Sequence, residues 1–155
     1  GFNTGPPNQA GRGPRPAGTA RGGPRAAIAP RADYIRDGEF DFDSGVEAAC
    51  ALLDLADPPG AIFASNDDMA AGVLSVAHDR RIDVPRDLSV AGFDDTTLAR
   101  MLWPTLTTIH QPMWELAEAA TKLLVEGGPT QHVRLPHHLV ERQSTARPAP
   151  IKDLA

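Results

Sequence analysis

The sequence predicts an α/β domain built on a doubly wound parallel sheet, and three observations lead to that fold class. Beyond residue 31, short apolar runs typical of strands alternate with longer stretches whose apolar residues recur at helical spacing. The run Ala61–Ser65 is small or apolar throughout, as in strands buried on both faces of a parallel sheet. With 155 residues and 41% hydrophobic content, the chain suits one domain whose strands are joined by right-handed crossovers.

The first elements are a strand over Ala32–Gly38 and a helix opened by Ser44-Gly-Val-Glu47. That tetrapeptide is interpreted as a capping box, in which the Ser hydroxyl and the Glu carboxylate each accept a hydrogen bond from a free backbone N–H. Pro58-Pro-Gly60 ends this helix, and Ala61–Ser65 follows as a central strand. The apolar face of the helix is expected to comprise Val46, Ala49, Cys50, Leu53 and Ala56.

The next helix is expected to begin at Asn66 or Asp67, because either side chain can cap the first backbone N–H groups. It runs to about Arg81, and Arg80 and Arg81 in its last turn complement the helix dipole. Its apolar face is expected to comprise Met69, Ala70, Val73, Leu74 and Ala77.

Further strands and one long helix complete the alternation. Leu88–Phe93 and Leu106–His110 are predicted strands, and Pro112 introduces a helix that ends at Gly127. A final strand is expected within Val133–Arg142. The apolar positions of the last helix are Met113, Leu116, Ala120, Leu123 and Leu124.

Polar residues follow three of the predicted strands. They lie in Gly38–Asp43, Ser65–Asp68 and Gly92–Asp95. Ligands of open α/β sheets bind beyond the carboxyl ends of the strands, so these three segments are expected to converge on one pocket.

Two of these polar residues suit a ligand with several hydroxyl groups. Asn66 offers an amide that both donates and accepts hydrogen bonds, and Asp94 offers a carboxylate that accepts from two hydroxyls. Phe40 or Phe42 would add an apolar ring face. Asn and Asp after strands also serve as helix caps or turn residues, so a purely structural role stays open for each.

Two acidic pairs, Asp67-Asp68 and Asp94-Asp95, leave another kind of site open. Acids at strand ends hold Mg²⁺ or accept a phosphoryl group in receiver-like domains. Such a site also needs a lysine at the end of a late strand, but Lys122 lies within a helix and Lys152 in the tail. This alternative is disfavoured, and neither a metal nor another cofactor is predicted.

No pattern for covalent catalysis occurs, so no catalytic residue is predicted. The five histidines lack paired metal-ligand spacing, and there is no nucleophile elbow or phosphate-binding loop. His137-His138 is expected to place one ring inside and one outside the sheet, while Trp103 and Trp114 serve packing or an interface. The single Cys50 is interpreted as a small buried hydrophobe.

Charge is divided unevenly along the chain. Residues 1–31 hold five arginines and no acid, while residues 32–155 hold ten basic against twenty acidic residues. An acidic body repels phosphates, so the chain alone is not expected to bind nucleic acid. No run approaches the ~18 apolar residues of a membrane span and no secretory signal is seen, so a cytoplasmic location is expected.

The segment from Ala10 to Pro30 differs in composition from the rest. Nineteen of its 21 residues are Gly, Ala, Pro or Arg, which do not build a core, and residues 1–31 are expected to be disordered. One interpretation is a basic interaction arm. The other is a frameshift, because these four residue types dominate the out-of-frame translation of GC-rich DNA.

Three spaced motifs, in Ala61–Gly72, Val84–Asp95 and Pro104–Thr108, resemble those of the LacI/GalR family of transcription regulators. The segment Leu135–Thr145 is similar to the closing strand of that family and its Arg-x-Ser-Thr ending. The resemblance covers about Ala32–Thr145. It implies the C-terminal lobe of a periplasmic-binding-protein-like (type I) effector domain.

The resemblance also assigns roles to single residues. Asn66 and Asp94 occupy positions that hydrogen-bond the effector, and Phe40 the position of an aromatic ring that stacks on it. Gln111, at the crossover between lobes, is expected to face the ligand as well. The positions through which such regulators dimerise are Ala71, Met101 and Leu102.

Domain boundaries follow from the same resemblance. Residues 32–146 form the effector-binding and dimerisation lobe, and 147–155 a tail. The helix over 112–127 would belong to an otherwise missing N-terminal lobe, so its apolar face would lack a partner. The family's effector-binding arginine belongs in a helix after Gly1–Pro7. There Gly18-Thr-Ala-Arg21, read one base away, can encode a similar Tyr-Arg stretch.

These inferences predict a sugar-sensing fragment of a LacI/GalR-type DNA-binding regulator that lacks its helix-turn-helix. The intact parent is expected to be a homodimer that responds to a small polar effector and reaches operator DNA only through its N-terminal domain. The fragment would not bind operator, would bind sugar weakly or not at all, and would be marginally stable. The main alternative is a solute-binding protein of a sugar transporter, and an enzyme is a remote third.

Overall fold

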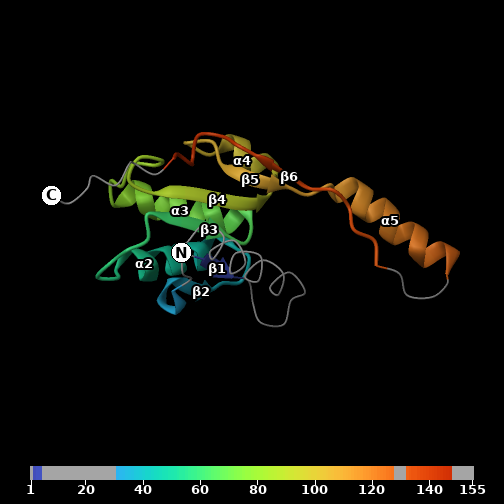
Figure 1. The fold of residues 1–155 in the computed structure, drawn as a ribbon, viewed down its shortest axis with the longest axis horizontal. Helices are drawn as coiled ribbons and strands as arrows, with labels where there is room; N and C mark the ends of the chain where they lie inside the picture. The colour runs from blue at the N-terminus through green and yellow to red at the C-terminus, as the bar shows by residue number, and fades with distance from the viewer. Residues whose placement is uncertain (1, 5–30, 128–131, 148–155) are drawn as a thin grey trace.

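The computed structural model describes residues 2–4, 31–127 and 132–147 of the chain (Figure 1). Within these residues, six strands form one sheet in the order β2-β1-β3-β4-β5-β6. All neighbouring strands are parallel except β5 and β6, which pair antiparallel. The predicted α/β fold class is confirmed. The strands are β1 (Phe2–Thr4), β2 (Ile35–Asp37), β3 (Ala61–Ala64), β4 (Ser89–Asp94), β5 (Thr107–His110) and β6 (His138–Val140).

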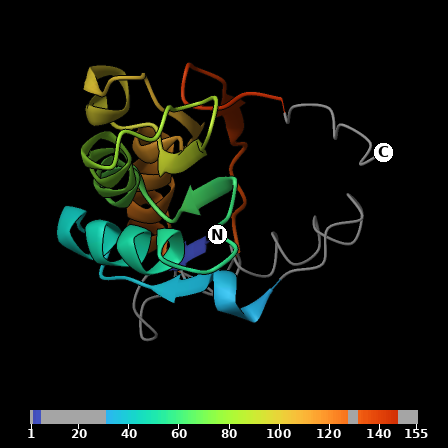
Figure 2. The same ribbon diagram turned by 90° about the vertical axis from the view of Figure 1, so that its left-hand side faces the viewer.

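Helices α2 (Phe42–Leu53) and α3 (Asp67–Asp79) pack side by side on one face of the sheet (Figure 2). They approach closely because each presents a glycine at the contact. A Cβ atom on Gly45 would lie 2.4 Å from the Met69 carbonyl oxygen, and one on Gly72 would lie 2.4 Å from a backbone oxygen of α2. Any larger residue at either position would therefore push the two helices apart.

The hydrophobic core lies between this helix layer and the sheet. All five apolar positions predicted for α3 are buried, together with Ile62 of β3 and Val90 of β4. On α2 the buried stripe is rotated from the predicted one, because Leu52 is fully buried whereas Leu53 is half-buried. Ala56, expected on the same face, is exposed and lies beyond the end of α2.

The residues after β6 return across the starts of β4 and β5. Ser144 is fully buried, where its hydroxyl donates to the Val90 carbonyl oxygen (2.6 Å) and accepts from the Thr107 backbone N–H (2.8 Å). The Arg142 guanidinium donates to the Leu106 carbonyl oxygen at 2.7 Å. The residues from Arg142 to Ser144, which we call the closing segment, thus connect β4 to β5 by hydrogen bonds.

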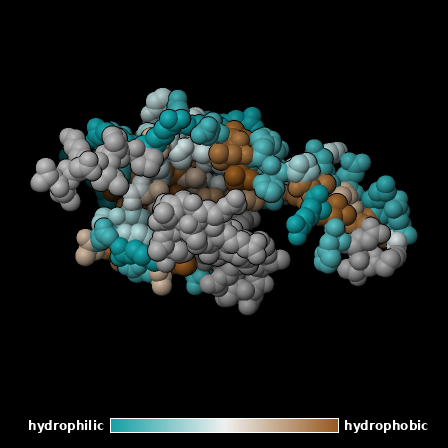
Figure 3. All heavy atoms as spheres, viewed as in Figure 1, coloured by the Kyte–Doolittle hydropathy of each residue, from teal (hydrophilic) through white to brown (hydrophobic). Residues whose placement is uncertain are grey.

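Helix α5 (Met113–Glu126) projects away from the sheet, and the chain enters it from β5 and returns through β6 (Figure 1). None of its residues is buried, and Leu124 and Val125 are 84% and 80% exposed. Apolar residues are visible along this helix in Figure 3. In the part of the chain described, no helix is long and apolar enough to cross a membrane.

The N-terminal region departs from the sequence prediction in two places. Phe2–Thr4, expected to be disordered, forms β1 between β2 and β3, because an aromatic and a β-branched residue suit a strand with a partner on each side. Residues 5–30, on which the frameshift hypothesis rests, lie outside the described residues. The predicted strand over Ala32–Gly38 is instead a single 3-10 turn, η1 (Ala32–Tyr34), followed by β2.

The first helix begins earlier than predicted. Its N-cap is Asp41, whose carboxylate accepts from the Ser44 backbone N–H at 2.9 Å. The Ser44 hydroxyl accepts instead from the Glu39 backbone N–H, also at 2.9 Å. The predicted capping box is therefore wrong, because Asp41, three residues upstream, caps the helix by accepting from the Ser44 N–H, and Ser44 already lies within the helix.

The second half of the chain differs in smaller ways. A short helix, α4 (Thr97–Met101), follows β4 where the sequence predicts none. Strand β6 occupies only three residues of the predicted Val133–Arg142. His137 and His138 are both exposed rather than one inside and one outside, because β6 begins at His138 and is an edge strand. Of the tail expected over 147–155, residues 148–155 lie outside the described residues.

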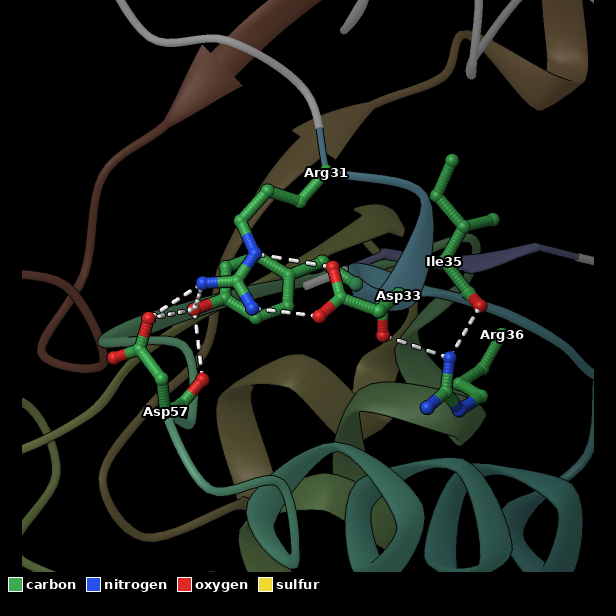
Figure 4. A network of polar contacts seen from close by, with 6 residues as sticks. Arg31, Asp33, Ile35, Arg36 and Asp57 are labelled. Atoms are coloured by element: carbon green, nitrogen blue, oxygen red, sulfur yellow. Dashed lines mark hydrogen bonds and ion pairs between the residues drawn. The ribbon is translucent and has the colours of Figure 1, made fainter.

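A polar network at the amino end of β2 joins this strand to the loop after α2 (Figure 4). The Arg31 guanidinium donates to both carboxylate oxygens of Asp33, at 3.0 and 2.6 Å, and to the Asp57 carboxylate at 2.5 Å. It also lies 4.2 Å over the Tyr34 ring. Hydrogen bonding from Arg31 holds the pKa of the Asp33 carboxyl below its usual range. This exposed network lies at the opposite edge of the sheet from the candidate site.

Candidate ligand-binding site

The candidate site lies at the carboxyl edge of the sheet, where β3, β4 and β5 end. In the β3–β4 pair Phe63 lies opposite Ala91, so Asn66 and Asp94, each three residues further along, reach the same edge. Strand β5 runs parallel beside β4, and Gln111 directly follows its last residue. The parallel register therefore brings three of the four predicted ligand-binding residues to one edge.

Asn66 connects the start of α3 to the loop after β2. Its side-chain oxygen accepts from the Met69 backbone N–H at 2.9 Å, and its side-chain nitrogen donates to the Phe40 carbonyl oxygen at 2.8 Å. The residue is only 8% exposed. The capping role that the sequence left open for Asn66 is thus confirmed, and its amide also holds Phe40, the predicted aromatic contact, at this edge.

Asp94 and Gln111 are joined directly. The Gln111 side-chain nitrogen donates to the Asp94 carboxylate, and its backbone N–H donates to the Asp94 carbonyl oxygen at 3.4 Å. Residues 94–96 and 110–115 line a cleft of about 410 Å³. Asp94 and Gln111 belong to this lining, whereas Phe40 and Asn66 do not. The four predicted residues thus form two neighbouring pairs rather than a single ring around one pocket.

Three residues at this edge adopt strained backbone conformations. Phe40 (φ 63°), Asp94 (φ 113°) and Asp95 (φ 58°) lie in the positive-φ region that L-residues rarely adopt. Each such residue costs on the order of 1–3 kcal/mol and persists only where the surrounding structure enforces it. Strain of this kind is typical of ligand sites, and here it falls at the ends of two strands where polar groups converge.

The two carboxylates of Asp94-Asp95 have different surroundings. Asp95 accepts from the Arg142 guanidinium at 2.5 Å, and its other oxygen lies 3.1 Å from Nδ1 of His110. Burial alone raises the pKa of the Asp95 carboxyl, but the hydrogen bonds from Arg142 and His110 outweigh it and hold this pKa below its usual range. The His110 ring in turn packs against His138, with centroids 4.9 Å apart. Asp95 is therefore a charged anchor for β5 and the closing segment.

Asp67 is a buried anchor that sequence reasoning missed. It is fully buried, and its carboxylate accepts from the Thr96 backbone N–H (2.7 Å), the Thr96 hydroxyl (3.1 Å) and the Thr108 hydroxyl (2.7 Å). It thereby joins the start of α3 to the loop after β4 and to β5. The sequence offers no local signal for this role, because its partners lie 29 and 41 residues away.

The acidic pairs do not form the alternative site considered from the sequence. The Asp67 carboxylate is committed to two threonines, Asp68 is exposed, and Asp95 is paired with Arg142. Among the described residues, no group of three His, Cys, Asp or Glu side chains is arranged to hold a metal ion. The geometry at this edge is that of hydrogen-bonding groups around a cleft.

The three residues expected at a dimer face differ in exposure. Met101 is 76% exposed and Leu102 is half-buried, whereas Ala71 is only 5% exposed within α3. Trp103, directly after them, is 87% exposed. The accessible apolar surface at the end of α4 therefore consists mainly of Met101 and Trp103.

Known proteins match the chain over most of its length. The profile of the family described as "periplasmic binding protein-like domain" matches residues 2–145. The chain is 42% identical over 120 residues to catabolite control protein A of Priestia megaterium, covering 74% of this chain and 36% of that protein. It is 43% identical over 109 residues to the HTH-type transcriptional repressor CytR of Escherichia coli K12, covering 70% and 32%. The chain thus spans about a third of the length of these relatives.

Solved structures agree with this match. A complex of the transcriptional regulator CelR with cellobiose superposes with a TM-score of 0.86 at 32% identity, covering 92% of this chain and 45% of that one. A LacI regulator from Bacillus cereus subsp. cytotoxis gives 0.89 at 29% identity, covering 94% and 53%. Fold and site together define an α/β domain with a cleft at its strand ends. The chain belongs to the periplasmic binding protein-like domain family, in the branch of the LacI/GalR-type regulators.

Proposed function

We propose that this chain is the effector-sensing lobe of a LacI/GalR-type transcription regulator and binds a small polyhydroxylated ligand at the carboxyl edge of its sheet. The observation that carries this proposal is the joined pair of Asp94 and Gln111 in the cleft, with Asn66 at the end of the neighbouring strand. Amide and carboxylate groups together can donate to and accept from several hydroxyls. The names of two relatives, the CelR–cellobiose complex and the ribose operon repressor of E. coli K12 (40% identical over 116 residues), support a sugar.

Sensing by this site requires no covalent chemistry. A ligand that binds one arrangement of the regulator better than another shifts the population between them. Gln111 offers a direct connection, because it contacts Asp94 in the cleft and is followed at once by Pro112 and α5. A ligand that engages Asp94 therefore acts on the junction through which α5 joins the sheet.

The partners proposed for the whole regulator follow from its relatives. Operator DNA is assigned to a separate part of the parent protein, since residues 32–155 carry ten basic against twenty acidic residues. A homodimer is proposed through the surface at the end of α4 that includes Met101 and Leu102, with the buried Ala71 behind it in α3. A cytoplasmic location follows from action on DNA. The named relatives favour this regulator over the solute-binding protein of a transporter and over an enzyme.

Calorimetric titration of the 155-residue chain with D-ribose and cellobiose tests the proposed site. We expect weak, millimolar binding of at least one sugar. Asp94→Asn should weaken it by about 10- to 100-fold, the cost of losing a charge-assisted hydrogen bond. Asp68→Asn, in an exposed carboxylate outside the cleft, should leave it unchanged. Equal affinity of the Asp94→Asn and Asp68→Asn variants would remove the cleft from the proposal.

A further inference from the structure

Trp114 is a large apolar residue that lines the cleft and yet is exposed to solvent. It lies in the first turn of α5 and belongs to the lining that contains Asp94 and Gln111. Its side chain is 82% exposed, so packing within the described part of the chain does not account for it. A large indole at the rim of a polar cleft is the combination that organic ligands use, with an apolar face for contact and a few polar groups for orientation.

The helical position of Trp114 separates it from the apolar stripe of α5. That stripe runs through Leu116 and Ala120, which are spaced four residues apart. The side of the helix that carries Trp114 is mixed in character, with Ala117, Glu118, Thr121 and Val125. A surface that covered the apolar stripe would therefore leave Trp114 at the margin of the contact, where this residue lines the cleft.

The charged residues that line the cleft restrict the charge of a ligand that could bind there. The lining residues 94–96 and 110–115 include the acids Asp94, Asp95 and Glu115 and no lysine or arginine. The nearby Arg142 is engaged with Asp95 at 2.5 Å. Within the part of the chain that the structure describes, a phosphate or carboxylate on the ligand would meet negative charge without a lysine or arginine in the lining to offset it. The cleft is thus suited to an uncharged ligand.

Starting from the proposed function, we propose that Trp114 is a ligand-contact residue that selects an uncharged sugar. The indole face packs on the C–H face of the sugar ring, while the ring hydroxyls bond to Asp94 and Gln111. Sugar phosphates and sugar acids are excluded by the acidic lining. This assigns Trp114 a role in specificity, in place of the packing or interface role expected from the sequence.

The second tryptophan provides a matched control. Trp103 is exposed to a similar degree, 87%, but lies outside the cleft lining. The 155-residue chain and its Trp114→Ala, Trp114→Phe and Trp103→Ala variants are titrated with cellobiose, D-ribose, glucose 6-phosphate and ribose 5-phosphate. Trp103→Phe leaves Trp114 as the sole tryptophan, so its fluorescence reports on the cleft directly. Circular dichroism and the urea midpoint check that each variant is folded.

The expected result has three parts. Trp114→Ala weakens binding of the neutral sugar about ten-fold or more, Trp114→Phe restores part of it, and Trp103→Ala changes nothing. The fluorescence of Trp114 changes on binding, and the two sugar phosphates bind more weakly than the neutral sugars. Unchanged affinity in a folded Trp114→Ala variant that still depends on Asp94 would overturn this inference alone. The absence of any sugar binding would overturn the proposed function and the inference with it.

Discussion

The carboxylate of Asp67 should be the most important single polar group for the stability of this domain. It lies at the start of α3, is fully buried, and accepts three hydrogen bonds from Thr96 and Thr108. Gly92 lies so close that a Cβ atom there would stand 2.6 Å from this carboxylate. The substitution Asp67→Ala removes the carboxylate that joins α3 to β5 and to the loop that follows β4.

The expected cost can be worked out from these contacts. The Thr108 hydroxyl is fully buried and would lose its carboxylate acceptor, which costs about 1–3 kcal/mol. The two bonds from Thr96, an exposed residue that donates to the buried Asp67 carboxylate, add about 1–2 kcal/mol. Because the variant no longer has to desolvate a buried carboxylate, a part of this cost is regained. We therefore expect the free energy of unfolding to fall by about 2–4 kcal/mol in Asp67→Ala.

Urea unfolding followed by circular dichroism at the helical band measures this change. Asp68→Ala is the matched control, because Asp68 occupies the same first turn of α3 but is exposed. It should lose only the helix-dipole contribution of about 0.3–1 kcal/mol. If the two variants lose equal stability, the assignment of Asp67 as the anchor of the site is refuted.

Three further predictions concern the same framework. Gly72→Ala should lower the unfolding free energy by about 1–3 kcal/mol, because its Cβ would meet the backbone of α2, whereas Gly60→Ala, with open space around it, should not. Ser144→Ala should cost about 2–3 kcal/mol in the same urea assay, since it leaves a buried backbone N–H and a buried carbonyl unpaired. The folded-state pKa of Asp95 is depressed, so the stability it contributes is present above its unfolded pKa of about 4 and is lost as the pH falls through the folded value. Asp95→Asn should flatten the acid side of the stability curve below about pH 5, where the unfolded carboxyl begins to bind its proton, and an unchanged slope there would contradict this.

The features that the sequence predicts correctly depend on local patterns. Helix α3 needs only the cap at Asn66 and apolar residues at helical spacing, both contained within one short stretch. The edge at which Asn66, Asp94 and Gln111 lie follows from the rule that parallel strands end together. Asp41 and Ser44 are both suitable N-cap residues at the start of α2, and the sequence pattern predicts Ser44 whereas the N-cap is Asp41.

The features that the sequence does not predict depend on distant partners. Asp67 looks like a second capping acid until Thr108, 41 residues away, is placed beside it. The hydrogen bond from Arg142 to Asp95 joins residues 47 positions apart in the sequence. It gives Asp95 a different environment from that of Asp94, its neighbour in the sequence. The exposure of Trp114 depends on how α5 leaves the sheet, which no periodicity records.

The function proposed for this chain requires that a sugar binds at the carboxyl edge of the sheet. Amide chemical shifts of the ¹⁵N-labelled chain, recorded during titration with cellobiose and D-ribose, test it most directly. We expect saturable shift changes concentrated in residues 94–96 and 110–115, with a smaller response around Asn66. No shift changes up to high millimolar sugar, or changes confined to the amino end of β2 around Arg31, would contradict it.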